Sequence, residues 1–121
     1  MSDNKQYVTR IQENGTVMIS EDVISTIIAQ AIADVEGLVG LSVKPGADIR
    51  EILGMNWGSG IKVYISEDNS LNIVCNVVIC YGHSVVDVAK NAQDAIINAV
   101  ESMTGVKVAS VNVNVCGIVR Q

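Results

Sequence analysis

The sequence predicts an α+β fold, a two-layer sandwich with two helices on one face of a mixed sheet. Two segments carry a single apolar stripe at helical spacing, one between Ser20 and Gly37 and the other between Ser84 and Gly105. Runs at 38–43, 61–66, 71–80 and 106–119 have the alternating or apolar character of strands. Because each helix is apolar on one side only, both are expected to lie on the same sheet. The predicted order is β-α-β-β-β-α-β.

The first 14 residues form a polar N-terminal segment that holds a short strand, and residues 15–121 form a single domain. Tyr7, Thr9 and Ile11 alternate with other residues up to Asn14-Gly15, which is a strong signal for a two-residue turn. A small hairpin that continues into residues 16–19 is one interpretation of this pattern. Ser20 then caps the first helix, whose opening turn holds two acids that suit the helix dipole.

The second half of the chain is predicted to be a hairpin, a long helix and a final strand. The strand at 71–80 follows a polar turn and leads into a helix that Ser84 caps and Gly105 ends. In the last strand the valines change phase between Val108 and Val111, which predicts a β-bulge near Ala109 and Ser110.

Composition excludes several classes of function. The net charge of −5 and the pI of about 4.6 leave no basic footprint for nucleic acid or an anionic membrane surface. Aromatic residues make up 3% of the chain, too few for a base-stacking surface. No signal peptide and no apolar run of membrane-spanning length is present in the sequence, so we expect a cytoplasmic protein without direct membrane insertion.

No catalytic, cofactor-binding or metal-ligating residue is assigned from the sequence. Cys75, Cys80, His83 and Cys116 are of the types that bind structural zinc, but they lack CxxC spacing, and residues five apart on one strand face opposite ways. Three cysteines without a secretory signal fit reduced thiols. Ser84, beside the single histidine, is better explained as a helix cap than as a nucleophile.

Two features remain as candidate sites. The first is a loop with Gly54, Trp57, Gly58 and Gly60, predicted to be mobile; it lacks the spacing of a phosphate-binding loop but could border a small-ligand pocket. The second is a mixed Val/Asn face of the sheet on which a partner or a second copy could dock. An ordinary exposed sheet face is an equal alternative. Its candidate residues are Val74, Val78, Asn112, Val113 and Asn114.

Two long stretches resemble the alkaline shock protein family, the envelope stress response proteins of Gram-positive bacteria. They are GTVMISEDVISTIIAQAIADVEGLVGLSV and GHSVVDVAKNAQDAIINAVESMTGVKVASVNVNVCGIV, which together extend from about Gly15 to Val119. The closing ESMTGVKVASVNVNVCG is the more specific half, and ISEDVI supports it. The sequence is similar to the short members that lack extended charged tails.

This resemblance implies a cytosolic, non-enzymatic protein that self-associates or binds an unlike protein, including a membrane-anchored one. The family pattern offers no catalytic residues to transfer to this chain. The function expected is therefore an interaction or scaffold module in cell-envelope homeostasis that acts through protein contacts. A small-ligand-binding or enzyme-accessory subunit that uses the Gly54–Gly60 loop is the alternative.

Overall fold

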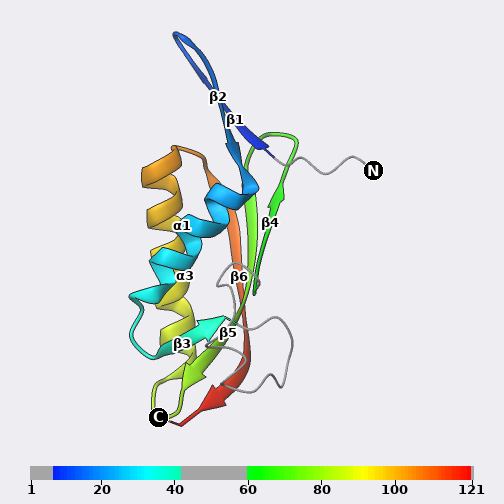
Figure 1. Ribbon diagram of the computed structural model, residues 1–121. Helices are drawn as coiled ribbons and strands as arrows, with labels where there is room; N and C mark the ends of the chain where they lie inside the picture. The colour runs from blue at the N-terminus through cyan, green and yellow to red at the C-terminus, as the bar shows by residue number, and fades with distance from the viewer. Residues whose placement is uncertain (1–6, 42–59, 121) are drawn as a thin grey trace.

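The computed structural model describes residues 7–41 and 60–120, and it has the predicted α+β architecture. Both helices of the described residues lie on one side of a sheet, and a hairpin extends beyond one end of it (Figure 1). The observed order has one more strand before the first helix than the sequence predicted. The elements are β1 (Tyr7–Gln12), β2 (Gly15–Ser20), α1 (Glu21–Ala33), β3 (Leu38–Leu41), β4 (Ile61–Ile65), β5 (Leu71–Cys80), α3 (Val85–Thr104) and β6 (Val108–Val119).

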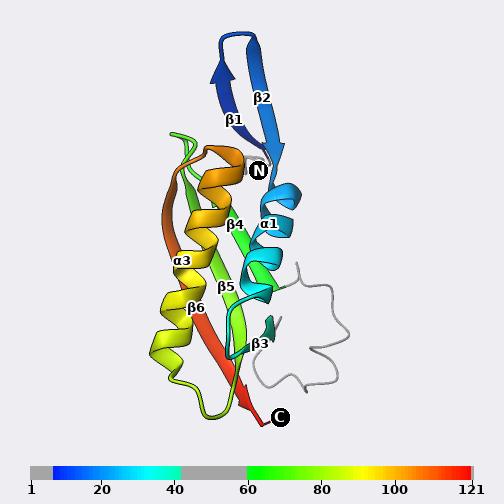
Figure 2. The same ribbon diagram turned by 90° about the vertical axis from the view of Figure 1, so that its left-hand side faces the viewer.

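Strand β5 is the centre of the main sheet. On one side it pairs antiparallel with β4 along Leu71–Cys75 and with β3 along Val77–Ile79, so these two short strands follow one another along the same edge. On the other side it pairs with β6 in parallel over its whole length. The parallel pair needs a crossover, which α3 provides as it covers the sheet (Figure 2).

Three of the four helix ends lie where the sequence predicts, whereas α1 ends at Ala33, before the Gly37 that was expected to stop it. The Oγ of Ser20 accepts a hydrogen bond from the Val23 N–H at 3.3 Å, and the Oγ of Ser84 accepts one from the Asp87 N–H at the same distance. Each bond satisfies a donor that the first helical turn leaves unpaired. At the far end of α3, Gly105 takes the left-handed conformation and its N–H bonds the Glu101 carbonyl at 2.9 Å.

The core lies between the two helices and the inner face of β5. Removing one such aliphatic side chain from water contributes about 1.5–3 kcal/mol. Cys75 is part of this core and has no exposed surface. The largest fully buried side chains are Ile24, Ile28, Ile32, Leu71, Ile73, Ile79, Ile96, Val8, Val77, Val100 and Cys75.

The first two strands form the hairpin that the sequence indicated, with the turn one residue earlier than predicted. Gln12 pairs with Gly15, so Glu13 and Asn14 are the two loop residues. The base of the hairpin is attached to the body, because Val8 is fully buried and the Thr9 N–H bonds the Asn69 side-chain oxygen at 3.4 Å. Its far end projects away from both layers (Figures 1 and 2).

Candidate interaction surfaces

The residues that suggested metal or nucleophile chemistry are not brought together. Among residues 7–41 and 60–120, no group of three His, Cys, Asp or Glu side chains is placed to hold a metal ion. Burial raises the pKa of the Cys75 thiol to about 12, so it stays protonated at neutral pH. The thiols of Cys80 and Cys116 are half-buried and lie near main-chain carbonyls. The Ser84 hydroxyl serves as the cap of α3.

Only part of the predicted Val/Asn surface is accessible. Asn112 and Asn114 are exposed on the face away from the helices, and Val74 there is half-buried. Val78 is 2% exposed, which corrects the expectation that it is available to a partner. Val113 is also corrected, because it is partly buried and packs against the core. Of the predicted loop, Gly54, Trp57 and Gly58 lie outside the described residues, and Gly60 is buried at their boundary.

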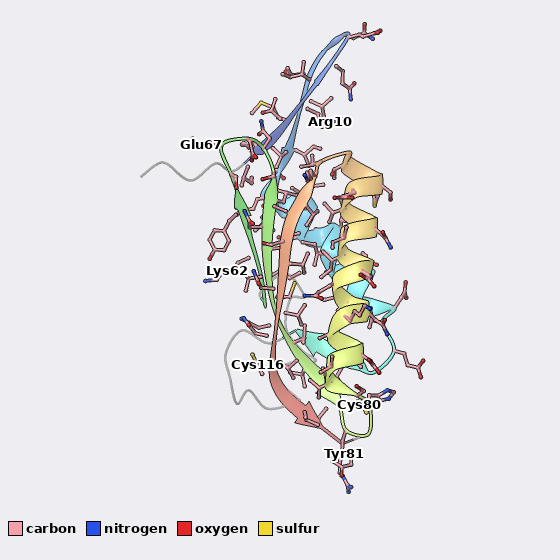
Figure 3. The ribbon with its side chains drawn as sticks, turned by 180° about the vertical axis from the view of Figure 1, so that it is seen from behind. Arg10, Lys62, Glu67, Cys80, Tyr81 and Cys116 are labelled. Atoms are coloured by element: carbon pink, nitrogen blue, oxygen red, sulfur yellow. The ribbon has the colours of Figure 1, made fainter. Side chains whose placement is uncertain are left out.

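Three of the asparagines on the open face, Asn72, Asn76 and Asn114, have hydrogen-bond partners within the chain. The Asn114 amide donates to the Asn76 side-chain oxygen at 3.0 Å. The Ser110 hydroxyl donates to the Asn72 side-chain oxygen at 2.8 Å, and these pairs tie β6 to β5. Figure 3 shows Lys62 on the side of the sheet opposite the helices. This face is therefore polar and internally hydrogen-bonded, which does not favour it as an apolar docking surface.

The projecting hairpin carries several exposed apolar side chains. Tyr7, Ile11 and Met18 share one of its faces, because Thr9 pairs with Met18 and alternate residues point the same way. They are 47%, 82% and 60% exposed, and we call them the hairpin patch. Apolar residues gathered on a projecting element commonly mark a protein contact. The sequence showed the alternation, but it could not show that this face has no core to cover it.

Strand β6 is a second unusual surface, because it is an edge strand without charge or proline. Within the part of the chain that is described, it pairs with β5 alone. Helix α3 covers the beginning of its free edge with two side chains. The Glu101 carboxylate accepts from the Val108 N–H at 3.0 Å, and the Gln93 amide donates to the Val111 carbonyl at 2.9 Å. The sequence analysis identified neither contact.

Two open hollows lie on the surface, one at the hairpin and one between the helices. One, of about 420 Å³, is where the hairpin meets two turns of the body, and it includes Arg10, Asp68 and Lys107. Hydrogen bonds from the side chain and then the backbone N–H of Ser70 lower the pKa of the Asp68 carboxyl. The other, of about 350 Å³, is apolar and lies between α1 and α3, where Ile27 and Met103 line it. Both are broad surface depressions rather than enclosed sites.

Comparison with known proteins decides the family. The model of the alkaline shock protein 23 family, described as having a cell envelope-related function, matches residues 9–120. The chain belongs to this family. The match includes most of the hairpin and all of the main sheet. Of the hairpin patch, Ile11 and Met18 lie inside the matched residues and Tyr7 lies outside them. The resemblance found in the sequence is confirmed.

Relatives of this alkaline shock family chain include proteins of Streptococcus pyogenes and Bacillus subtilis. The uncharacterized protein Spy1535 of Streptococcus pyogenes is 33% identical over 107 residues, which are 88% of this chain and 81% of the relative. The uncharacterized protein YloU of Bacillus subtilis is 31% identical over 109 residues, 86% of this chain and 88% of the relative. YqhY of Bacillus subtilis is 28% identical over 106 residues, 86% and 77% of the two chains. No solved structure matches the chain.

One structural observation concerns whether a helix of this chain could span a membrane. Neither helix in the described part of the chain combines the length and the apolar composition needed to span a bilayer. The exposed side of α3 instead carries acids, including Asp87, Asp94 and Glu101.

Proposed function

We propose that this protein is a non-enzymatic interaction module of cell-envelope homeostasis that contacts another protein through the hairpin patch. The family supplies the link to the cell envelope. The observation that carries the interaction is the exposure of Tyr7, Ile11 and Met18 on one face of a projecting arm. Burying each of these side chains in a contact would contribute about 1.5–3 kcal/mol.

The attachment of the hairpin supports this role. A two-stranded hairpin alone is marginally stable in water, so it needs an anchor to present a defined face. Val8 provides this anchor by inserting into the core, and the Thr9–Asn69 hydrogen bond adds a second tie. The base is therefore fixed while the hairpin patch stays exposed on one face, which allows a partner to bury apolar surface without disturbing the sheet.

The partner that fits is an unlike protein, and a membrane-anchored one would bring this chain to the envelope. The chain has a net charge of −5, so an anionic lipid surface would repel it. Recruitment through apolar contacts with an anchored protein avoids that repulsion. Cytoplasmic residence and recruitment through a partner are both part of this proposal.

Complementation of a strain that lacks the gene tests the proposal. We expect the deletion to increase sensitivity to alkaline pH or to cell-wall antibiotics, and the wild-type gene to restore resistance. Ile11→Ser should fail to restore it, while its protein accumulates and melts like wild type. Val86→Ser is the matched control, because Val86 is 74% exposed on α3, away from the hairpin. Full restoration by Ile11→Ser, or no envelope phenotype in the deletion, would refute the proposal.

A further inference from the structure

We propose that the polar hollow at the base of the hairpin receives an acidic side chain of the unlike protein that contacts the hairpin patch. Arg10 and Lys107 would hold the carboxylate of that side chain. The inference rests on the proposed function for the existence of the partner, and it adds the chemistry by which the partner is recognised. Because Ile11 belongs to the hairpin patch and also lines this hollow, one segment of the partner can reach both.

Three segments that are distant in the sequence form the walls of this hollow. The Thr9 N–H bonds the Asn69 side-chain oxygen at 3.4 Å, which ties β1 to the turn between β4 and β5. The Leu71 N–H bonds the Lys107 carbonyl at 3.0 Å, which ties the end of that turn to the connection between α3 and β6. The walls are therefore in place before a partner arrives, so little ordering cost falls on binding. The lining residues are Thr9, Arg10, Ile11, Asp68, Asn69, Ser70, Gly105, Val106 and Lys107.

The guanidinium of Arg10 lies flat against a glycine. A Cβ on Gly105 would lie 3.0 Å from a terminal nitrogen of this group, 3.1 Å from its central carbon and 3.2 Å from its Nε. These nearly equal distances place the plane of the group over the glycine, where the hairpin meets the end of α3 and the helix dipole favours a cation (Figure 3). In the described part of the chain no hydrogen bond or ion pair uses this guanidinium. Its N–H donors therefore stay available to an acceptor that enters the hollow.

The acids beside the two cations are engaged by other groups. The Asp68 carboxylate accepts hydrogen bonds from the Ser70 hydroxyl at 2.7 Å and from the Ser70 N–H at 3.1 Å. These two bonds are the main causes that lower the pKa of Asp68, and the charge of Lys107 adds a smaller effect in the same direction. The Glu101 carboxylate accepts from the Val108 N–H at 3.0 Å. A further carboxylate between Arg10 and Lys107 would therefore meet cations that the chain itself uses little.

Charge and shape favour a single protein carboxylate as the occupant. The planar guanidinium of arginine matches the two oxygens of a carboxylate, and Lys107 adds a second positive charge at the same hollow. The whole chain carries 8 basic and 13 acidic residues, so a polyanion such as nucleic acid or an anionic membrane would be repelled by the rest of the surface. An Asp or Glu next to an apolar residue of the partner avoids that repulsion. The apolar neighbour would then cover Ile11 of the hairpin patch.

NMR titration of the purified protein with two peptides tests the inference. The probes are acetyl-Leu-Glu-Leu amide and acetyl-Leu-Gln-Leu amide, which differ in the charge of the central side chain. We expect the Glu peptide to bind about three-fold or more tighter, because exposed ion pairs add modestly to affinity, and to shift the amide signals of Gly105 and Lys107. The preference should disappear in Arg10→Gln with Lys107→Gln and persist in Lys62→Gln with Lys90→Gln, which removes two exposed cations elsewhere. Equal binding or no binding of the two peptides, or a preference that survives the loss of Arg10 and Lys107, would overturn the inference.

Complementation separates this inference from the proposed function. In the deletion strain, Arg10→Gln with Lys107→Gln should restore less resistance than wild type, and Lys62→Gln with Lys90→Gln should restore it fully. If Ile11→Ser fails to restore resistance while the Arg10 and Lys107 double variant restores it fully, the hairpin patch is needed but its partner brings no carboxylate to the hollow, and this inference alone fails. Full restoration by Ile11→Ser would instead refute the proposed function, and the peptide titration would then decide whether the hollow binds carboxylates by itself.

Discussion

Replacement of Gly37 by alanine probes the turn that brings β3 onto the central strand. Gly37 has a φ of 89°, and its carbonyl accepts the Cys80 N–H at 2.8 Å. A Cβ at this position would lie 2.9 Å from atoms of the His83 ring and 2.9 Å from a methyl carbon of Val88. His83 is exposed and can turn away, but Val88 is only 4% exposed and is held by the core. The contact with Val88 therefore decides the outcome.

The expected loss of stability has two parts. A side chain in the left-handed region costs about 1–2 kcal/mol. Forcing a methyl group against a packed side chain costs about 1–3 kcal/mol more. Gly82→Ala measures the backbone cost without the packing cost, because the φ of 102° at Gly82 imposes a similar strain while a Cβ there meets nothing within 4 Å. We expect Gly37→Ala to lower the free energy of unfolding by about 2–5 kcal/mol, and Gly82→Ala by about 1–2 kcal/mol.

Urea unfolding followed by circular dichroism measures both variants against wild type. The two-state slope should stay unchanged, so that a shift in midpoint reports stability alone. Equal losses for Gly37→Ala and Gly82→Ala would show that the close contact with Val88 does not exist. That result would refute the placement of the α1–β3 turn against α3.

Three further predictions concern individual side chains. Burial raises the pKa of the Cys75 thiol, so its contribution to the free energy of unfolding is complete below the thiol's ordinary pKa of 9.0 and is lost as pH rises toward about 12. Cys75→Ala should therefore reduce the fall in the free energy of unfolding over this pH range, measured by unfolding at a series of pH values. Ser70→Ala should raise the lowered pKa of Asp68 toward its ordinary value in an NMR titration, because both hydrogen bonds from Ser70 favour the carboxylate and the hydroxyl supplies the larger effect. Gln93→Ala should cost about 1 kcal/mol of unfolding free energy by removing the donor to the Val111 carbonyl, and an unchanged urea midpoint would contradict that bond.

Local signals made much of the fold predictable. Ser20 and Ser84 cap the helices where the sequence indicated, because a serine before an amphipathic run can accept a hydrogen bond from an N–H that the first helical turn leaves unpaired. The phase change of the valines correctly placed a bulge at Ala109. The family was also readable, since the ISEDVI and ESMTGVKVASVNVNVCG segments are specific enough to carry it.

The candidate surfaces were harder to predict because they depend on tertiary placement. Alternation showed that Val113 and Asn112 face opposite ways, but not which of them the helices cover. The burial of Val78 has no local signal for the same reason. Gln93 and Glu101 have the composition of a solvated helix face, and only the closeness of α3 to β6 makes them partners of its edge.

Photo-crosslinking in living cells tests the central claim most directly. A benzophenone amino acid replaces Met18 in the hairpin patch or, as a control, Asp94 on the exposed side of α3. If the hairpin patch contacts another protein, irradiation should give a discrete product heavier than the 12.9 kDa chain from position 18 and none from position 94. The absence of a product from position 18, or the same products from both positions, would contradict the claim.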